Sequence, residues 1–157
     1  MSEKTILVIR IRGGIDVPWY VEDTMRMLRV DHNNYATILK ETPSYQGMLR
    51  KAKDHITWGE PSVETIKLIL ISRGKLIGDK PITDESLKEL GYDGVDGLAA
   101  KIKNGEIEFS ALNGIKPFFR MHPPKKGFRR SVKHPYNDRG ELGYRGESID
   151  ELAKRMC

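Results

Sequence analysis

Basic and aromatic side chains alternate over residues 116–146, and they are the residues best suited to contact a charged partner. The segment has nine Lys and Arg residues against two acidic ones, so it carries +7 in a chain whose total charge is +5. Its aromatic residues are Phe118, Phe119, Phe128, Tyr136 and Tyr144. Cations neutralise phosphates and rings stack on bases, which favours nucleic-acid binding. The candidate contacts are Lys125, Lys126, Arg129, Arg130, Lys133 and His134.

The ordinary alternative for such a charge run is a solvated, flexible tail. The segment has four prolines, four glycines and few aliphatic residues, so we expect that it cannot bury a core by itself. Ordering its backbone costs roughly 1 to 2 kcal/mol per residue, which predicts that it stays mobile until RNA is present. The interleaved aromatic rings favour a binding role over a bare tail.

A second candidate site lies at the predicted start of a helix. Thr42 is typical of an N-cap, and Pro43 fits the first helical position. The free backbone N–H groups of a helix start attract phosphate, and Arg50 and Lys51 extend the positive charge along the helix. An ordinary capped helix with a solvated basic face is the alternative.

Patterns for catalysis or metal binding are weak. Gly13 and Gly14 follow a predicted strand, but neither G-x-G-x-x-G nor a Walker pattern surrounds them, so a turn is favoured. The four histidines lack the spacing of metal ligands, and Cys157 lies at the end of the chain. We therefore expect no catalytic centre, no metal, no cofactor and no small-molecule substrate.

The first sixty residues predict a β-α-β-α-β order. The expected elements are a strand at 5–12, a helix from Pro18, a strand at 35–39, a helix from Thr42 and a strand at 55–58. The first strand is apolar enough for burial on both faces, with Arg10 and Arg12 emerging at its end. In the first helix, Val21, Met25 and Leu28 form one apolar stripe.

Helices dominate the next part of the chain. They are expected at 62–73, 83–90 and 96–103, and residues 107–109 and 116–121 are predicted to be extended. The second of these extended runs is a candidate to pair with an earlier strand. Ser148 and Glu151 have capping-box spacing before a last short helix. The predicted class is α+β, with units at 1–60, 61–115 and 116–157, the last an extended basic segment ending in that helix.

Composition excludes several other classes. No apolar run approaches the roughly 18 residues needed to cross a bilayer, so we expect no membrane span. The single cysteine excludes an internal disulfide, and the first residues lack a signal-peptide cleavage pattern. These features predict a cytoplasmic protein.

Three sequence blocks, in order and at family spacing, carry a family resemblance. They are VIRIRG at 8–13, EDTMRMLRV at 22–30, and TPSYQGMLRKAKD at 42–54 followed by ITWGE at 56–60. Together they resemble the universal large-subunit ribosomal protein thirty family, called L-thirty in bacteria and archaea and L-seven in eukaryotes. The later helices and the run at 118–124 resemble its longer forms. A long basic extension before the first strand is missing, which indicates the archaeal form.

The resemblance implies a ferredoxin-like module with a helical extension, in a non-enzymatic protein of the large ribosomal subunit. Its implied partners are large-subunit ribosomal RNA and neighbouring ribosomal proteins. The loop after the first strand and the start of the second helix are implied to face RNA. Those positions are Arg10, Arg12, Gly13, Thr42, Pro43, Tyr45, Gly47, Met48 and Lys51.

Two other classes stay open from the residues alone. One is a ferredoxin-like regulatory binding protein that uses the basic tail as a nonspecific anchor. The other is an RNA-processing enzyme, which would need a clustered His, Lys or carboxylate constellation that the sequence does not display.

Overall fold

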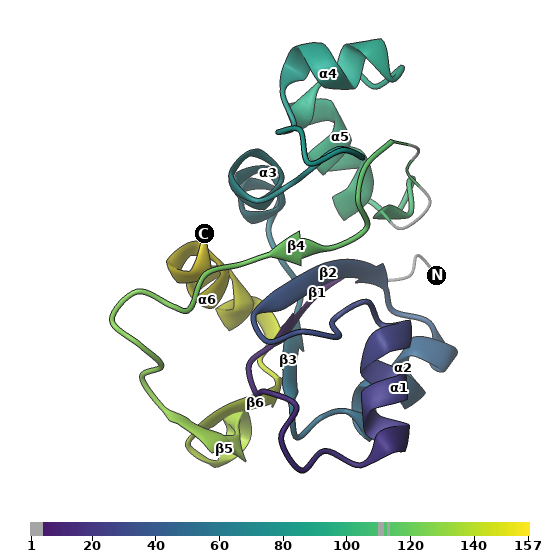
Figure 1. Ribbon diagram of the computed structural model, residues 1–157. Coiled ribbons are helices and arrows are strands. Elements are labelled where there is room, and N and C mark those ends of the chain that lie inside the picture. Colours follow the sequence, from purple (N-terminus) through teal and green to yellow (C-terminus); the bar gives the residue numbers. More distant parts are fainter. Residues whose placement is uncertain (1–4, 110–111, 113) are drawn as a thin grey trace.

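A six-stranded sheet forms the centre of the protein, in the order β4-β2-β1-β3-β6-β5 (Figure 1). The computed structural model describes residues 5–109, 112 and 114–157. The strands are β1 Thr5–Arg10, β2 Tyr35–Lys40, β3 Ile56–Gly59, β4 Phe119–Arg120, β5 Ser131–Pro135 and β6 Gly140–Tyr144. The helices are α1 Trp19–Met27, α2 Pro43–Lys51, α3 Val63–Ser72, α4 Asp84–Glu89, α5 Val95–Lys103 and α6 Ile149–Met156, with short 3-10 turns η2 Tyr136–Asp138 and η3 Gly146–Ser148. The predicted α+β class is confirmed.

The central strand β1 is buried on both faces, as its apolar run predicted. Ile6 and Val8 point to one face of the sheet, and Leu7 and Ile9 point to the other. β1 runs antiparallel to both β2 and β3, so the sequence order β1-α1-β2-α2-β3 places β1 in the middle of these three strands.

Helices α1 and α2 lie side by side and cover one face of the sheet (Figure 1). The predicted stripe of Val21, Met25 and Leu28 is buried there, together with Leu49 of α2. The Thr42 side chain accepts the backbone N–H of Tyr45 at 3.1 Å, which confirms the predicted N-cap of α2. We name this apolar layer the α1–α2 core.

The other face of the sheet is covered by α3, α5 and α6. Leu7, Ile9 and Ile38 of the sheet belong to this larger apolar cluster, and the rings of Phe109 and Phe119 stack in it at 5.0 Å. The three predicted helices after residue 60 are all present, with side-chain N-caps at Ser62 and Thr83. Within the described part of the chain, no helix is long and apolar enough to cross a membrane.

Residues 116–157 are built into the fold, which corrects the prediction of an extended segment. β4 pairs with β2, as expected for one of the extended runs, while β6 pairs with β3 and β5 lies beside β6. Phe119, Leu142 and Leu152 are almost completely buried in the larger cluster. The few apolar residues of this segment do not make a core of their own, but they complete the core of the sheet.

Two local predictions in this half of the chain are wrong. Ser148 does not cap α6: its backbone is helical, and its hydroxyl lies 2.9 Å from the hydroxyl of Tyr136. Residues 107–109, expected to be extended, do not form a strand: residue 107 is a bend, residue 108 has no regular structure and Phe109 has a 3-10 conformation. In both cases a tertiary contact outweighs the local preference: Ser148 contacts the Tyr136 hydroxyl, and Phe109 is buried in the core.

Gly59 of β3 lies where the strand passes the backbone of η3. A Cβ at this position would overlap the carbonyl group of Gly146 and lie 3.1 Å from Cβ of Ile149. Because backbone atoms cannot swing aside, we expect Gly59→Ala to destabilise the fold by about 1 to 3 kcal/mol. Denaturant unfolding of the variant measures this, and an unchanged midpoint would contradict the close approach of β3 and η3.

Candidate nucleic-acid interface

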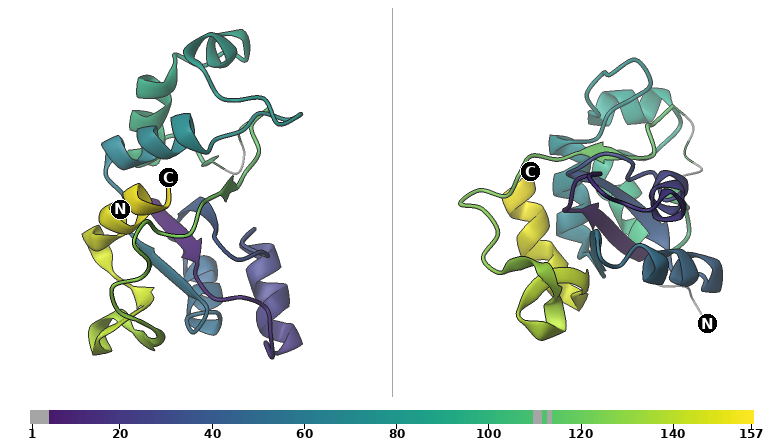
Figure 2. Two further views of the ribbon diagram at one scale, coloured as in Figure 1. Left: turned by 60° about the vertical axis from the view of Figure 1, so that its left-hand side comes forward. Right: turned by 60° about the horizontal axis from the view of Figure 1, so that its bottom comes forward.

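The predicted contact residues fall on two separate surfaces of the protein. The first, named the loop surface, comprises the loop after β1 and the exposed face of α2. The second, named the basic edge, comprises residues 125–134, which lead to and include most of β5. Helices α1 and α2 cover one face of the sheet, whereas β5 is the strand at one edge of the sheet and α6 packs on the opposite face (Figures 1 and 2). A partner that touches both surfaces must therefore extend around the sheet.

The loop after β1 is tied to the end of α2. The backbone N–H groups of Ile11 and Arg12 donate to the carbonyl of His55, and Nη1 of the half-buried Arg12 donates to the carbonyl of Asp54 at 3.2 Å. Gly13 is exposed beyond them. The structure thus brings Arg12 to the turn that follows α2, with Gly13 beside it in the chain. The other predicted contacts at Thr42 and Pro43 lie at the opposite end of this helix.

Arg10, which the family resemblance implied to face RNA, is buried inside the protein. Its side chain is 1% exposed, and its guanidinium pairs with Glu22 at 3.0 Å. Nε donates to the carbonyl of Arg12 at 2.8 Å, and Nη1 donates to the carbonyl of Val30 at 3.2 Å. All three contacts of the guanidinium are internal. Arg10 therefore stabilises the loop after β1 and does not lie on the loop surface.

The predicted residues of α2 divide by helical face. Pro43, Gly47, Arg50 and Lys51 are exposed, and Thr42 is partly exposed while it caps the helix. Tyr45 and Met48 are half-buried and pack against the α1–α2 core. The exposed face is therefore narrower than the predicted one, and its charge comes from Arg50 and Lys51.

Gly47 offers a test that separates the fold of α2 from its contacts. No atom lies within 4 Å of a Cβ built at this position, so the substitution causes no clash within the chain. Because Gly in a helix interior costs conformational entropy, Gly47→Ala is expected to stabilise the fold by about 0.5 to 1 kcal/mol. If RNA approaches this face closely, the same variant binds RNA more weakly. Thermal unfolding measures the first effect, and a lower stability would contradict it.

An exposed apolar group beside the loop surface was missed by the sequence reasoning. Ile15 is 90% exposed, Trp19 is 76% exposed and Tyr20 is 46% exposed. The two rings meet edge to face at 5.9 Å, and Nζ of Lys51 lies 5.5 Å from the centre of the Tyr20 ring. Both rings directly follow Pro18 and lie off the buried stripe of α1, a pattern that identifies them as surface aromatics. We include Trp19 and Tyr20 in the loop surface.

His55, at the base of the loop surface, adds no charge to it at neutral pH. Burial lowers the pKa of its imidazole below the ordinary value, and the positive charges of Arg12 and Arg10 lower it further. The positive charge of this surface therefore comes from arginine and lysine side chains.

The basic edge presents all six of its predicted residues to solvent: Lys125, Lys126, Arg129, Arg130, Lys133 and His134. Lys126 and Gly127 both have positive φ angles and form a turn. Arg155 of α6 holds this turn, because its guanidinium donates to the carbonyls of Lys125 and Gly127. Hydrogen bonds thus join the start of the basic edge to α6.

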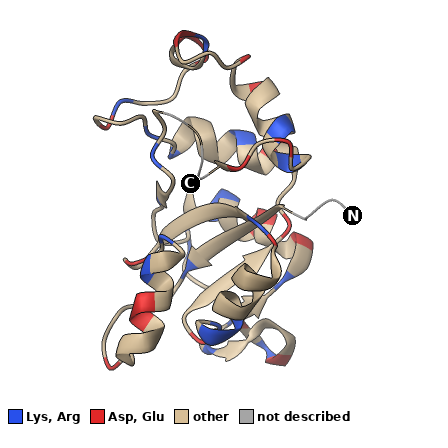
Figure 3. Ribbon diagram, turned by 90° about the vertical axis from the view of Figure 1, so that its right-hand side faces the viewer, with Lys and Arg blue, Asp and Glu red and all other residues tan. Residues whose placement is uncertain are grey.

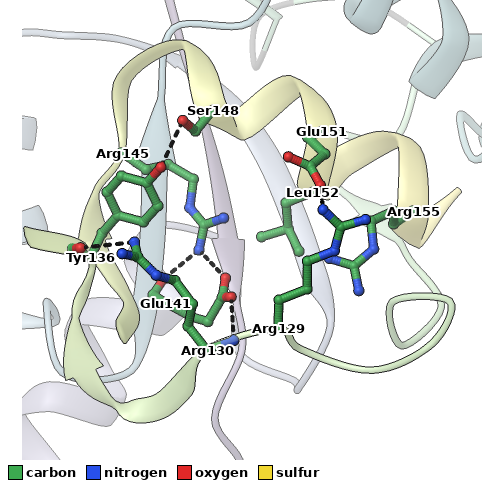
Figure 4. Close-up of a pocket in the computed structure, with 9 residues that line it drawn as sticks. All are labelled: Arg129, Arg130, Tyr136, Glu141, Arg145, Ser148, Glu151, Leu152 and Arg155. Atoms are coloured by element: carbon green, nitrogen blue, oxygen red, sulfur yellow. Dashed lines mark hydrogen bonds and ion pairs between the residues drawn. The ribbon is translucent and has the colours of Figure 1, made fainter. Parts of the chain in front are cut away.

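A pocket of about 190 Å³ opens between the basic edge, β6 and α6 (Figure 4). Its lining residues are Arg129, Arg130, Tyr136, Glu141, Arg145, Ser148, Glu151, Leu152 and Arg155. Arg145 and Glu141 form a buried ion pair at 2.6 Å, each side chain only 5% exposed, and Nε of Arg145 donates to Oγ1 of Thr57 at 2.9 Å. We name this site the arginine pocket; Tyr136, Arg145 and Arg155 were not among the predicted contacts.

Charge is spread over the molecule and is not gathered on one element. Viewed from the side of α1 and α2, basic and acidic positions are interspersed from the upper helices to the lower end of the molecule (Figure 3). A macromolecule with charge distributed along its length fits this arrangement better than a single small anion.

A mixed α+β body that exposes lysine and arginine side chains on two surfaces, with exposed aromatic rings on one of them, has the surface chemistry of a nucleic-acid-binding protein. Comparison with known proteins gives its family. The family model described as Ribosomal protein L30p/L7e matches residues 6–56. The large ribosomal subunit protein uL30 of Staphylothermus marinus is 49% identical over 156 residues, covering 95% of this chain and 96% of the relative.

Two further relatives carry the same name. The uL30 protein of Methanosphaera stadtmanae is 46% identical over 150 residues, covering 95% of this chain and 97% of the relative. That of Ignicoccus hospitalis is 45% identical over 159 residues, covering 99% of each chain. The chain therefore belongs to the ribosomal protein L30p/L7e family, among the archaeal uL30 proteins of the large ribosomal subunit. The predicted family is confirmed.

Proposed function

We propose that the protein binds the ribosomal RNA of the large subunit through the loop surface and the basic edge together. The observation that carries this proposal is the exposure of all six basic-edge residues on a segment that joins the sheet and contacts α6. The exposed cations Arg50 and Lys51 support the same role for the loop surface, which lies over one face of the sheet. Family membership supports the large subunit as the source of the RNA.

The physical mechanism is phosphate neutralisation combined with base stacking. Lysine and arginine side chains on both surfaces replace counterions of the RNA backbone, so affinity falls steeply as salt rises. Trp19 and Tyr20 supply exposed rings for unpaired bases, each stack contributing on the order of 1 to 3 kcal/mol. The sheet holds the two surfaces apart, which suits a protein that joins two RNA segments.

The finer organisation is part of the same proposal. Residues 1–60 act as a ferredoxin-like module, a reading supported by the order β1-α1-β2-α2-β3 with both helices on one face. Residues 61–115 form the helical extension, and residues 116–157 carry the basic edge. Neighbouring ribosomal proteins are proposed partners of surfaces that RNA leaves free. The alternative, a regulator with a nonspecific tail, predicts a protein found apart from ribosomes.

Charge reversal on α2 tests the proposed function. We expect the double variant R50E/K51E to fold normally, because both side chains are exposed, and to enter large subunits much less than the unmodified chain. The matched control is K80E/K88E, which reverses two exposed lysines far from both surfaces. Sucrose-gradient sedimentation of cell lysates measures incorporation. Equal incorporation of the two double variants would show that the α2 face is merely solvated.

A further inference from the structure

The arginine pocket is too small for an ordinary small-molecule site and is strongly cationic. Its volume of about 190 Å³ lies below the roughly 300 to 1,000 Å³ of typical ligand pockets. Four guanidinium groups line it. Arg129 and Arg130 directly precede β5, Arg145 follows β6, and Arg155 lies in α6. In Figure 4, Arg129 and Arg155 lie on one side of the pocket, and Arg130 and Tyr136 lie on the other.

Two of the four guanidinium groups are neutralised inside the protein and two are not. Arg145 pairs with Glu141, and Arg129 pairs with Glu151 at 2.6 Å. For Arg130 and Arg155, no carboxylate lies within ion-pair distance in the described part of the chain, and their internal partners are backbone carbonyl groups. The pocket therefore holds a net charge of +2 that only an outside anion neutralises.

Contacts inside the protein hold Arg130 in position before any ligand arrives. Its guanidinium lies 4.8 Å from the centre of the Tyr136 ring, and that of Arg145 lies 5.1 Å from the same ring. Nη1 of Arg130 donates to the carbonyl of Tyr136 at 3.2 Å, and the backbone N–H of Arg130 donates to Glu141 at 3.0 Å. These contacts lower the entropy that Arg130 loses when it binds an anion.

We propose that the arginine pocket binds one phosphate group of the ribosomal RNA backbone, between Arg130 on one side and Arg155 on the other. The planar guanidinium fork matches the oxygens of a phosphate, and the pocket has the size and the unneutralised charge for that group. This inference rests on the proposed function and deepens it, because it assigns one defined contact with the RNA backbone to named residues of the basic edge and α6.

The test is a pair of Arg→Lys substitutions that keep the net charge. Arg130→Lys retains the positive charge but loses the fork and its stacking on Tyr136. The matched control is Arg139→Lys: Arg139 is exposed in the same segment and does not line the pocket. We expect Arg130→Lys to weaken binding to large-subunit RNA roughly tenfold, and Arg139→Lys to leave it within about twofold. Equal affinities would overturn the proposal. Thermal unfolding of both variants checks that the fold is unchanged.

Inorganic phosphate provides a second readout. At constant ionic strength set with chloride, phosphate is expected to compete with RNA for the unmodified chain more strongly than for Arg130→Lys, and equal competition would overturn the pocket. If the unmodified chain failed to bind large-subunit RNA at all, the proposed function would be wrong and the pocket would lose its partner. If the chain bound RNA and the two Arg→Lys variants behaved alike, the pocket proposal alone would fail.

Discussion

Replacing Lys125, Lys126 and Lys133 together by Gln is expected to weaken binding to large-subunit ribosomal RNA roughly a hundredfold at low salt. Each of these side chains is exposed on the basic edge, so the substitutions remove charge without opening the core. The slope of log affinity against log salt is expected to become shallower by about two to three, since each neutralised phosphate contributes about 0.7 to 0.9. Fluorescence anisotropy over a salt series measures both quantities.

The control for this variant removes the same charge elsewhere. Lys80, Lys88 and Lys101 lie on the helical extension, and their replacement by Gln is expected to leave the slope unchanged. Equal slopes for the two triple variants would contradict the account of the basic edge. Deleting the chain after Gly114 is a poorer experiment, because it also removes Phe119 and Leu142 from the core and destabilises the body that carries the loop surface.

Glu141→Gln is expected to have the largest effect on stability. The substitution leaves the buried guanidinium of Arg145 without its carboxylate, and Glu141 also accepts the backbone N–H of Arg130. Removing one partner of a buried ion pair costs about 3 to 5 kcal/mol, because the remaining charge stays desolvated. Denaturant unfolding at neutral pH measures this loss.

Glu151→Gln is the matched control for this stability effect. Glu151 pairs with Arg129 at 2.6 Å, the same distance as in the buried pair, but both side chains are more than half exposed. Because solvent screens an exposed pair, the expected cost is below about 1 kcal/mol. Similar losses for both variants would mean that the burial of Glu141 and Arg145 does not govern their energetics.

The local sequence was enough to predict most of the regular elements. The β-branched run of β1 and the stripe of Val21, Met25 and Leu28 have clear periodicities, and the caps at Thr42 and Ser62 mark helix starts by residue type. These features depend on neighbours within a few residues, so the folded structure keeps the elements that they predict. The exposure of the basic edge was likewise predictable, because Lys and Arg are seldom buried without partners.

Long-range pairing accounts for what the sequence did not reveal. β6 joins β3 across more than eighty residues, and Thr57 donates its hydroxyl to the carbonyl of Gly143 at 2.7 Å. Nothing near Gly143 in the sequence specifies that partner. The same limit applies to Arg10. An arginine at the end of a strand is equally compatible with an exposed side chain, and the sequence does not show that Glu22 lies beside it. In the folded chain Arg10 pairs with Glu22 and is buried.

The most direct test of the account is ultraviolet cross-linking within intact large ribosomal subunits, followed by identification of the peptides attached to RNA. Binding through both surfaces predicts cross-links in the peptide that contains Trp19 and Tyr20 and also in peptides from residues 125–136. Cross-links to neither region, in subunits shown to contain the protein, would contradict the claim that these two surfaces bind RNA.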